Sequence, residues 1–155
     1  MQRAKKLLLA IASAALASGV AFADKPHPSL KQTDLNYTQP FGDDGPKVAP
    51  VEGKWGNGKP ASMFIIFKAG QQGAWHTHTD DYDCVVLKGT YTEQQKGEPM
   101  VDVPAGSWLH QPSVQPHRNG CKAGGDDCLV YIYFAHRADA VLTDENGKPV
   151  PPPKK

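Results

Sequence analysis

The sequence predicts an all-β protein, a barrel or sandwich of antiparallel strands. Gly (15 residues) and Pro (14) together make 29 of the 155 residues, and they separate short apolar runs. These runs are rich in Val, Ile, Phe and Tyr, which favour a pleated, half-buried surface, and long amphipathic helical segments are nearly absent. We expect strands at residues 61–68, 74–78, 84–93, 100–103, 107–111, 116–120 and 128–135.

The first 23 residues have the pattern of a secretory signal peptide. Arg3, Lys5 and Lys6 precede an apolar stretch, residues 7–23, that ends in Ala-Phe-Ala before Asp24. A basic head, an apolar middle of this length and small residues two apart are the features of such a signal. The sequence therefore predicts cleavage after Ala23 and a periplasmic or secreted protein.

Beyond residue 23, three regions are expected. Residues 24–60 carry six prolines and little apolar periodicity, so they predict an irregular N-terminal arm with room for one edge strand. Residues 61–142 contain the apolar runs and predict the β-barrel. Residues 143–155 predict a Pro-rich polar tail, extended and without strand pairing.

Charge and motifs exclude several function classes. Without residues 1–23 the chain has 14 basic and 16 acidic residues, a net charge of −2, which provides no basic face for nucleic acid. No apolar segment after residue 23 is long enough to span a membrane. A Gly-rich phosphate loop, a Cys-x-x-Cys pair and a G-x-S-x-G turn are all missing from the sequence.

The three cysteines divide into a pair and a remainder. Cys121 and Cys128 flank a turn-rich loop, and disulfides persist in exported proteins, so we expect these two to be bonded. The alternative is two free thiols at the ends of neighbouring strands. Cys84 lies in an apolar run and is expected to be a buried, inert thiol.

His76 and His78 form the densest pair of candidate metal ligands. Residues two apart on a strand share a face, so both imidazoles can point into one cavity. Neutral imidazole suits Fe, Mn, Zn, Ni or Cu. Two surface histidines on an edge strand would give the same pattern.

The spacing around this pair resembles the first motif of the cupin superfamily. That motif is Gly, five residues, His-x-His, three or four residues, Glu, six residues, Gly. Here Gly70, His76, His78, Tyr82 and Gly89 follow one another at these intervals.

A second stretch resembles the second cupin motif: Gly, five residues, Pro-x-Gly, two residues, His, three residues, Asn. Gly106, Pro112, Val114, His117 and Cys121 occupy these positions. The resemblance covers residues 61–135 and implies a single-domain, RmlC-like antiparallel jelly-roll barrel, similar to a cupin branch of unassigned function. It also implies that His76, His78 and His117 hold one divalent metal ion.

Three positions depart from the family pattern, because Tyr82 replaces the usual Glu ligand, Val114 replaces Gly and Cys121 replaces Asn. For the fourth ligand we consider three alternatives. Tyr82 could bind as phenolate, which suits ferric iron best. A carboxylate from Asp80, Asp81 or Asp83 could bind instead. We favour the third, in which three histidines are the whole protein set and Tyr82 is a nearby or substrate-facing hydroxyl.

Other polar and aromatic side chains near the motifs are weaker candidates. Trp75, Trp108, His110 and Gln111 could line the cavity, although core packing is the favoured role for the two tryptophans. Tyr82, Gln111 and the Asp80–Asp83 cluster are the candidates for acid–base chemistry. His27 and His136 are expected to face solvent.

The resemblance implies function only in outline. Dioxygenase, isomerase and lyase activities occur on cupin barrels, so we expect a small metalloenzyme, such as an oxidoreductase, acting on an organic acid, phenol or sugar. The alternative is a non-catalytic barrel that binds or senses a metal or small ligand. A homodimer is possible, because cupins often dimerise by sharing strands.

Overall fold

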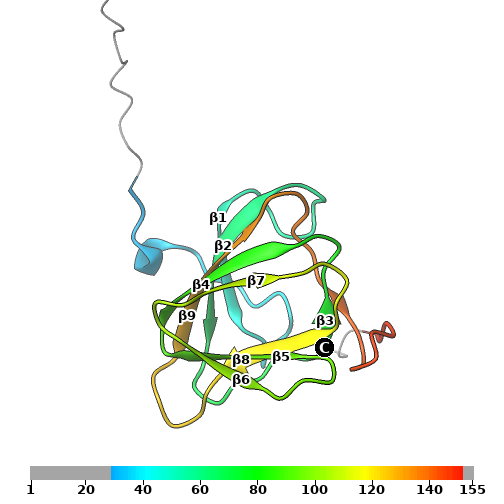
Figure 1. The fold of residues 1–155 in the computed structure, drawn as a ribbon. Helices are drawn as coiled ribbons and strands as arrows, with labels where there is room; N and C mark the ends of the chain where they lie inside the picture. The colour runs from blue at the N-terminus through cyan, green and yellow to red at the C-terminus, as the bar shows by residue number, and fades with distance from the viewer. Residues whose placement is uncertain (1–28, 152–155) are drawn as a thin grey trace, which may run out of the picture.

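Two antiparallel sheets face each other and enclose the interior of a barrel (Figure 1). The computed structural model describes residues 29–151. The predicted signal peptide, His27 and the last four residues lie outside this range. Among the described residues, no helix is long and apolar enough to cross a membrane, and the one helical segment is the 3-10 turn η1, Gln32–Asp34.

The first sheet has the strand order β1-β2-β9-β4-β7. Its strands are β1 (Lys47–Glu52), β2 (Ala61–Phe67), β9 (Cys128–Phe134), β4 (Tyr82–Lys88) and β7 (Trp108–Gln111). The second sheet has the order β10-β3-β8-β5-β6. Its strands are β10 (Val141–Leu142), β3 (His76–Thr77), β8 (His117–Cys121), β5 (Thr90–Gln95) and β6 (Val101–Pro104). The predicted all-β jelly-roll fold is confirmed.

Strand alternation builds the core between the sheets. On β2, Met63, Ile65 and Phe67 are buried, and they pack against the alternate residues of β9 and β4. Because β2 pairs with β9 along its whole length, from Ala61 opposite Phe134 to Phe67 opposite Cys128, the two strands present one continuous apolar wall.

The single strand predicted at residues 84–93 is wrong, since the chain changes sheets at Gly89. Strand β4 ends at Lys88 in the first sheet and β5 begins at Thr90 in the second. Gly89 has a φ of +77°, and a Cβ there would lie 2.9 Å from both Asp127 O and Cys128 Sγ. Only glycine fits this turn without strain.

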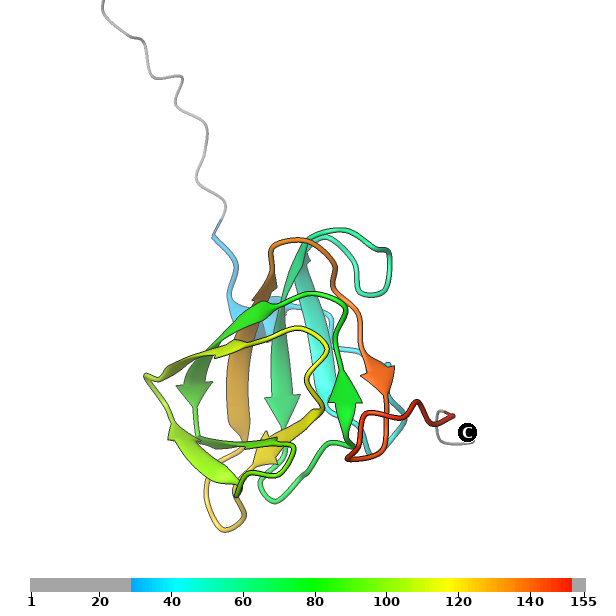
Figure 2. The same cartoon turned by 45° about the vertical axis from the view of Figure 1, so that its right-hand side comes forward.

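The ends of the described chain pair more than expected. Strand β1 falls in the predicted arm and pairs with β2, which agrees with one edge strand there. Strand β10 was not predicted; it lies beside β3, as the orange and green arrows show in Figure 2. Thr143 bridges Pro149, and Val150 N donates to Leu142 O at 2.9 Å. The expectation of a tail without pairing is therefore wrong for the described residues, because a turn folds this segment back.

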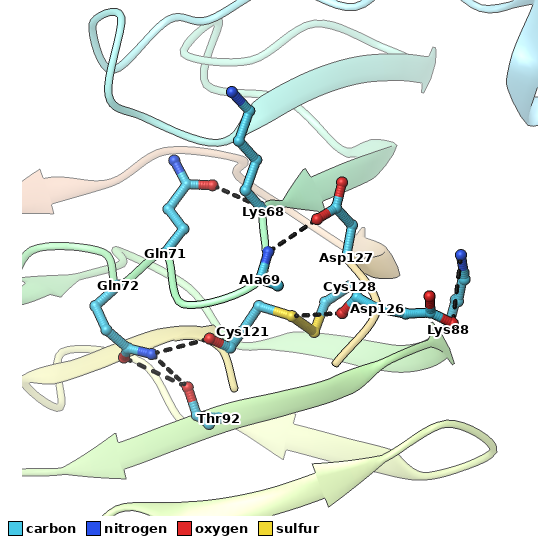
Figure 3. Close-up of a disulfide and its surroundings, with 10 residues drawn as sticks. All are labelled: Lys68, Ala69, Gln71, Gln72, Lys88, Thr92, Cys121, Asp126, Asp127 and Cys128. Carbon is cyan, nitrogen blue, oxygen red and sulfur yellow. Dashed lines mark hydrogen bonds and ion pairs between the residues drawn. A yellow bond between two sulfur atoms is a disulfide. The ribbon is translucent and has the colours of Figure 1, made fainter. Parts of the chain in front are cut away.

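The predicted Cys121–Cys128 disulfide is present, with the two Cα atoms 5.6 Å apart (Figure 3). It joins the end of β8 to the start of β9, and therefore one sheet to the other. The carboxylate of Asp127 accepts a hydrogen bond from Ala69 N at 2.9 Å, so the loop before the second cysteine is also tied to the end of β2. Cys84 is fully buried, as predicted, and burial raises the pKa of its thiol well above the usual value.

Candidate metal centre

Three histidines from two stretches of chain meet inside the barrel. His76 begins β3, His78 follows that strand, and His117 begins β8. The antiparallel pairing sets His76 directly opposite His117, and strand alternation turns His78 to the same side as His76. The ring centroids of His76 and His117 lie 4.3 Å apart, and those of His76 and His78 4.9 Å.

Each imidazole is oriented by a backbone carbonyl. His76 Nδ1 lies 2.9 Å from Ala74 O, His117 Nδ1 lies 3.0 Å from Gln115 O, and His78 Nδ1 is in close contact with Asp139 O. A carbonyl oxygen can only accept, so in each pair the hydrogen is on Nδ1. The lone pair of each neutral ring is therefore on Nε2, which is the arrangement found in metal-binding histidines.

Burial keeps these rings uncharged. It lowers the pKa of His78 to about 3 and that of His117 to about 2, and in both the neighbouring His76 adds a further lowering. Burial also lowers the pKa of His76. His78 Nε2 is buried and has no hydrogen-bond partner among the described residues. An orphaned acceptor of this kind is costly unless something binds it, and a cation would do so.

The nitrogens are close enough for one ion after a small adjustment. One ligand nitrogen from each of the three histidines lies within 4.8 Å of the others. Nitrogens bound to one ion at about 2.1 Å lie roughly 3.4 Å apart in tetrahedral geometry, so each ring needs to shift by on the order of 1 Å. The residues present therefore fit a three-histidine metal centre.

Tyr82 lies beside the histidines as a neutral phenol. Its side chain is buried, and its hydroxyl donates to His117 Nε2 at 3.4 Å. Burial raises the pKa of this phenol well above its ordinary value. Before any ion is bound, Tyr82 is thus a proton-bearing hydroxyl next to the predicted metal position.

The nearby aspartates serve a different group. Asp83 Oδ1 lies 3.0 Å from His110 Nδ1, and Asp81 Oδ2 lies 3.5 Å from His110 Nε2. Asp81 also accepts a hydrogen bond from Ser113 N at 2.7 Å. Within residues 29–151 no carboxylate joins the three histidines at ligand distance, and Asp80 is not among the grouped residues.

The other four candidates differ in where their side chains lie. His110 is exposed and Trp108, stacked on it, is 63% exposed, so core packing is wrong for Trp108. Its neighbours Leu109 and Gln111 take the inward positions of β7. Trp75 is half-buried under Arg118 rather than in the core. Gln111 is buried, its side-chain amide donates a hydrogen bond to the carbonyl of the next residue, Pro112, and it does not line the cavity. His136 is exposed, as predicted.

A cavity of about 210 Å³ opens beside His76 and His78. Sequence reasoning missed most of its other walls. Phe41 and Trp55 come from the arm, where no periodicity marks them, and Trp55 packs edge-on against His78 with ring centroids 6.4 Å apart. Tyr91 and Asn119 come from β5 and β8. Asn119 could have been found, because it follows His117 by two residues on the same strand face.

Glu93 is a buried carboxyl group that sequence reasoning also missed. It is 7% exposed, its Oε1 accepts from Gln95 Nε2 at 3.2 Å, and its Oε2 has no partner among the described residues. Burial raises its pKa to about 8, so it is protonated at neutral pH. It shares the inward face of β5 with Tyr91, which was the available signal.

Two further contacts hold His78 in place. Val114 N donates to His78 O at 2.9 Å from a turn where Val114 has a φ of 52°, the only positive value outside glycine in the described chain. The Asp139 carboxylate accepts hydrogen bonds from Thr79 N at 2.9 Å and from Thr79 Oγ1 at 2.6 Å. The backbone carbonyl of the same residue accepts one from His78 Nδ1. Val114 thus has a left-handed conformation at the position where the cupin motif has glycine.

The comparisons with known proteins give structural neighbours alone. No family model and no curated protein sequence matches the chain. A protein of unknown function with a cupin-like fold from Ralstonia eutropha JMP134 is 15% identical, with a TM-score of 0.63 over 83% of this chain and 78% of that one.

Two neighbours have a stated activity. The polyketide cyclase RemF from Streptomyces resistomycificus is 13% identical, with a TM-score of 0.60 over 76% of this chain and 85% of that one. The DMSP lyase DddQ from Ruegeria pomeroyi DSS-3 is 19% identical, with a TM-score of 0.57 over 72% of this chain and 62% of that one. At this level of sequence identity, the structural similarity shows a shared fold and not a shared activity. The two-sheet barrel, its strand order and these neighbours show that the chain has the fold of the cupin superfamily.

Proposed function

We propose that the protein is a metal-dependent enzyme that acts on a small oxygenated compound. The observation that carries this proposal is the orientation of His76, His78 and His117, whose Nδ1 atoms are held by carbonyls so that each Nε2 carries the lone pair, and His78 Nε2 has no partner among the described residues. One divalent ion, Fe, Mn, Zn, Ni or Cu, fits such a neutral nitrogen set. When bound, it supplies positive charge and open coordination positions for substrate oxygen.

The chain's own groups supply orientation and a proton donor. The cavity next to His76 and His78 has mostly apolar walls, which strengthen electrostatic effects at the site. Tyr82 carries its proton at neutral pH and lies 3.4 Å from His117 Nε2, so its hydroxyl is placed to donate to a developing oxyanion. Lyase and cyclase activities among the structural neighbours support catalysis on this fold, without choosing the reaction.

The experiment is turnover by protein reconstituted with each single metal. Dioxygen uptake and product formation are followed over a panel of phenols, organic acids and sugars. The double variant His76→Ala, His117→Ala removes two proposed ligands, and His110→Ala is the matched control, because that histidine is exposed and bound to aspartates. We expect turnover in the wild type and the control and none in the double variant.

Equal turnover in all three proteins would contradict the proposal. Metal bound by the wild type without turnover on any substrate would favour the non-catalytic alternative, a barrel that binds or senses a metal or small ligand.

We also propose that the protein functions in the periplasm or outside the cell. The signal-like pattern of residues 1–23 supports this location, and so does the Cys121–Cys128 disulfide, because such bonds persist in oxidising compartments. Cell fractionation and the mass of the exported chain test it, and we expect a mature chain that begins at Asp24. A homodimer remains a prediction, which light scattering in solution tests.

A further inference from the structure

The cavity beside the histidines has aromatic walls. Phe41 and Trp55 stand edge to face with centroids 5.5 Å apart, and Phe67 packs likewise on Tyr91 at 5.6 Å. All four rings line the cavity, together with aliphatic groups of β2 and β9. Its volume of about 210 Å³ is below the roughly 300–1,000 Å³ typical of sites for drug-sized ligands. A ligand of one ring fits this space.

Charge restricts the ligand further. Among the described residues that line the cavity, none is Lys or Arg, and the one carboxylate, Asp44, is exposed. A buried anion is costly unless it is paired, and here only the ion at the histidines can pair with it. Phosphorylated compounds and di- or tricarboxylates would therefore leave charges without partners.

Polar groups in the cavity are few. The Tyr91 hydroxyl is buried beside that of Tyr82 and makes no hydrogen bond of good geometry within the described part of the chain. The Asn119 side chain is 6% exposed and also lines the cavity. A sugar carries four or five hydroxyl groups that each need a partner when buried. Gln72, the other amide that lines the cavity, is already bonded to Thr92 and to Cys121 O. Tyr82, Tyr91 and Asn119 are too few to satisfy a sugar, whereas one or two oxygen substituents match what they offer.

We propose that the site takes an uncharged or singly charged one-ring aromatic compound with one or two oxygen substituents, and that Tyr91 selects it by hydrogen bonding to one of those oxygens. The ring occupies the space between the aromatic walls of Phe41, Trp55 and Phe67. This inference rests on the proposed function, because the ion at the histidines is what receives the substrate oxygen. Of the three substrate classes considered, phenols, organic acids and sugars, it selects the phenols.

Calorimetric titration of metal-loaded protein with catechol, citrate and glucose tests the proposal. We expect catechol to bind at least tenfold more tightly than the other two. Tyr91→Phe removes the unpaired hydroxyl and should weaken catechol binding about tenfold, the equivalent of one hydrogen bond of about 1.4 kcal/mol. The control is Tyr131→Phe, a half-buried tyrosine stacked on Phe64 that does not line the cavity, and its affinity should equal that of the wild type.

Tighter binding of citrate or glucose, or equal loss in the Tyr91 and Tyr131 variants, would overturn the proposal. A second variant, Trp55→Leu, is expected to weaken catechol binding without changing metal content, and unchanged binding would also count against the aromatic walls. Metal content measured in the same samples separates the two claims. Retained metal without catechol binding refutes this inference alone, while absence of metal refutes the proposed function. Thermal denaturation identifies any variant that fails to fold.

Discussion

At the scale of single residues, the site depends on which ring nitrogen carries the hydrogen. Three separate carbonyls, of Ala74, Gln115 and Asp139, impose the same tautomer on three histidines. Such fixed orientation lowers the cost of ordering the rings around an ion. The arrangement is difficult to explain by packing alone, because it leaves His78 Nε2 buried and unpaired.

Tyr82 stands where the cupin motif has a carboxylate ligand, and we expect it to stay a neutral hydroxyl beside the ion. Tyr82→Phe should therefore keep the metal content of the wild type, since the histidines provide the binding groups. Iron-loaded wild-type protein should lack the visible absorption of a ferric phenolate. Absorption spectra and elemental analysis check both points, and a coloured wild type that bleaches in Tyr82→Phe would make Tyr82 a ligand instead.

Val114 is a β-branched residue in a left-handed conformation, with a φ of 52°. That conformation costs roughly 1–2 kcal/mol for residues with a Cβ, partly offset by the greater chain entropy of glycine. Val114→Gly should thus raise the free energy of unfolding by up to about 1 kcal/mol and keep the hydrogen bond to His78 O. Urea denaturation measures the change. Val114→Ala, which keeps the Cβ, should show a smaller gain, and a destabilised glycine variant would contradict this explanation.

The sequence predicted the histidines but only part of their surroundings. Spacing along two strands suffices for His76, His78 and His117, because local alternation fixes the face of each. The walls formed by Trp55 and Tyr91 depend on contacts between distant segments, which no local pattern records. Gln111 is buried opposite Tyr82 and bonds with Gln95, and its role in catalysis stays a prediction.

At the scale of elements, the strands were largely predictable and their assignment to sheets was not. The alternation of buried residues on the two sides of Gly89 does indicate the change of sheet. Tyr82, Cys84 and Val86 face inward on β4, at even positions, whereas Tyr91 and Glu93 face inward on β5, at odd positions. The change of parity marks the sheet switch, but it is visible only when the buried face of each strand is known.

The disulfide should matter most for the two strands that it joins. Replacing Cys121 and Cys128 by Ser removes a cross-link and so increases the conformational entropy of the denatured chain. For so short a loop the entropic model gives a loss of about 2.5 kcal/mol in the free energy of unfolding. Denaturant unfolding of the double variant tests this value. Metal content should be unchanged, because His117 lies at the opposite end of β8 from Cys121. Loss of metal without loss of stability would show that the bond positions the site instead.

At the scale of the whole molecule, buried ionisable groups make stability depend on pH. Metal-free protein has His78 and His117 with pKa values of about 3 and 2. Below pH 6.5 these two histidines are protonated in the unfolded chain but stay neutral in the folded chain, so the free energy of unfolding decreases as the pH is lowered. The slope is up to about 1.4 kcal/mol per pH unit for each histidine. Acid denaturation should be less steep in a His78→Gln, His117→Gln variant.

Glu93 has the opposite effect on the pH dependence of stability, because it makes the protein less stable as the pH rises. Its pKa in the folded chain is about 8, above the 4.5 of an exposed carboxyl, so its contribution is complete below pH 4.5 and is lost as pH rises through 8. Its neighbours Cys84 and Tyr91 stay neutral, because burial raises their pKa values too. Between pH 6.5 and 8 the contribution of Glu93 to the stability of the metal-free protein should fall by about 1.6 kcal/mol, while the buried histidines contribute a smaller change in the opposite direction.

Glu93→Gln should remove this loss, since an amide does not ionise. Urea unfolding of both proteins with a chelator present, at pH 6.5 and pH 8, measures it. A wild type whose stability changes between the two pH values by the same amount as that of the variant would show that Glu93 does not titrate in this range.

Metal content measured by elemental analysis tests the account most directly. Wild-type protein and the control His110→Ala should each retain one equivalent of a divalent metal after dialysis. The double variant His76→Ala, His117→Ala should retain less than a tenth of that amount, because a single remaining imidazole cannot hold the ion. Equal metal in all three proteins, or none in the folded wild type after incubation with each candidate ion, would contradict the convergence of three imidazoles on one cation.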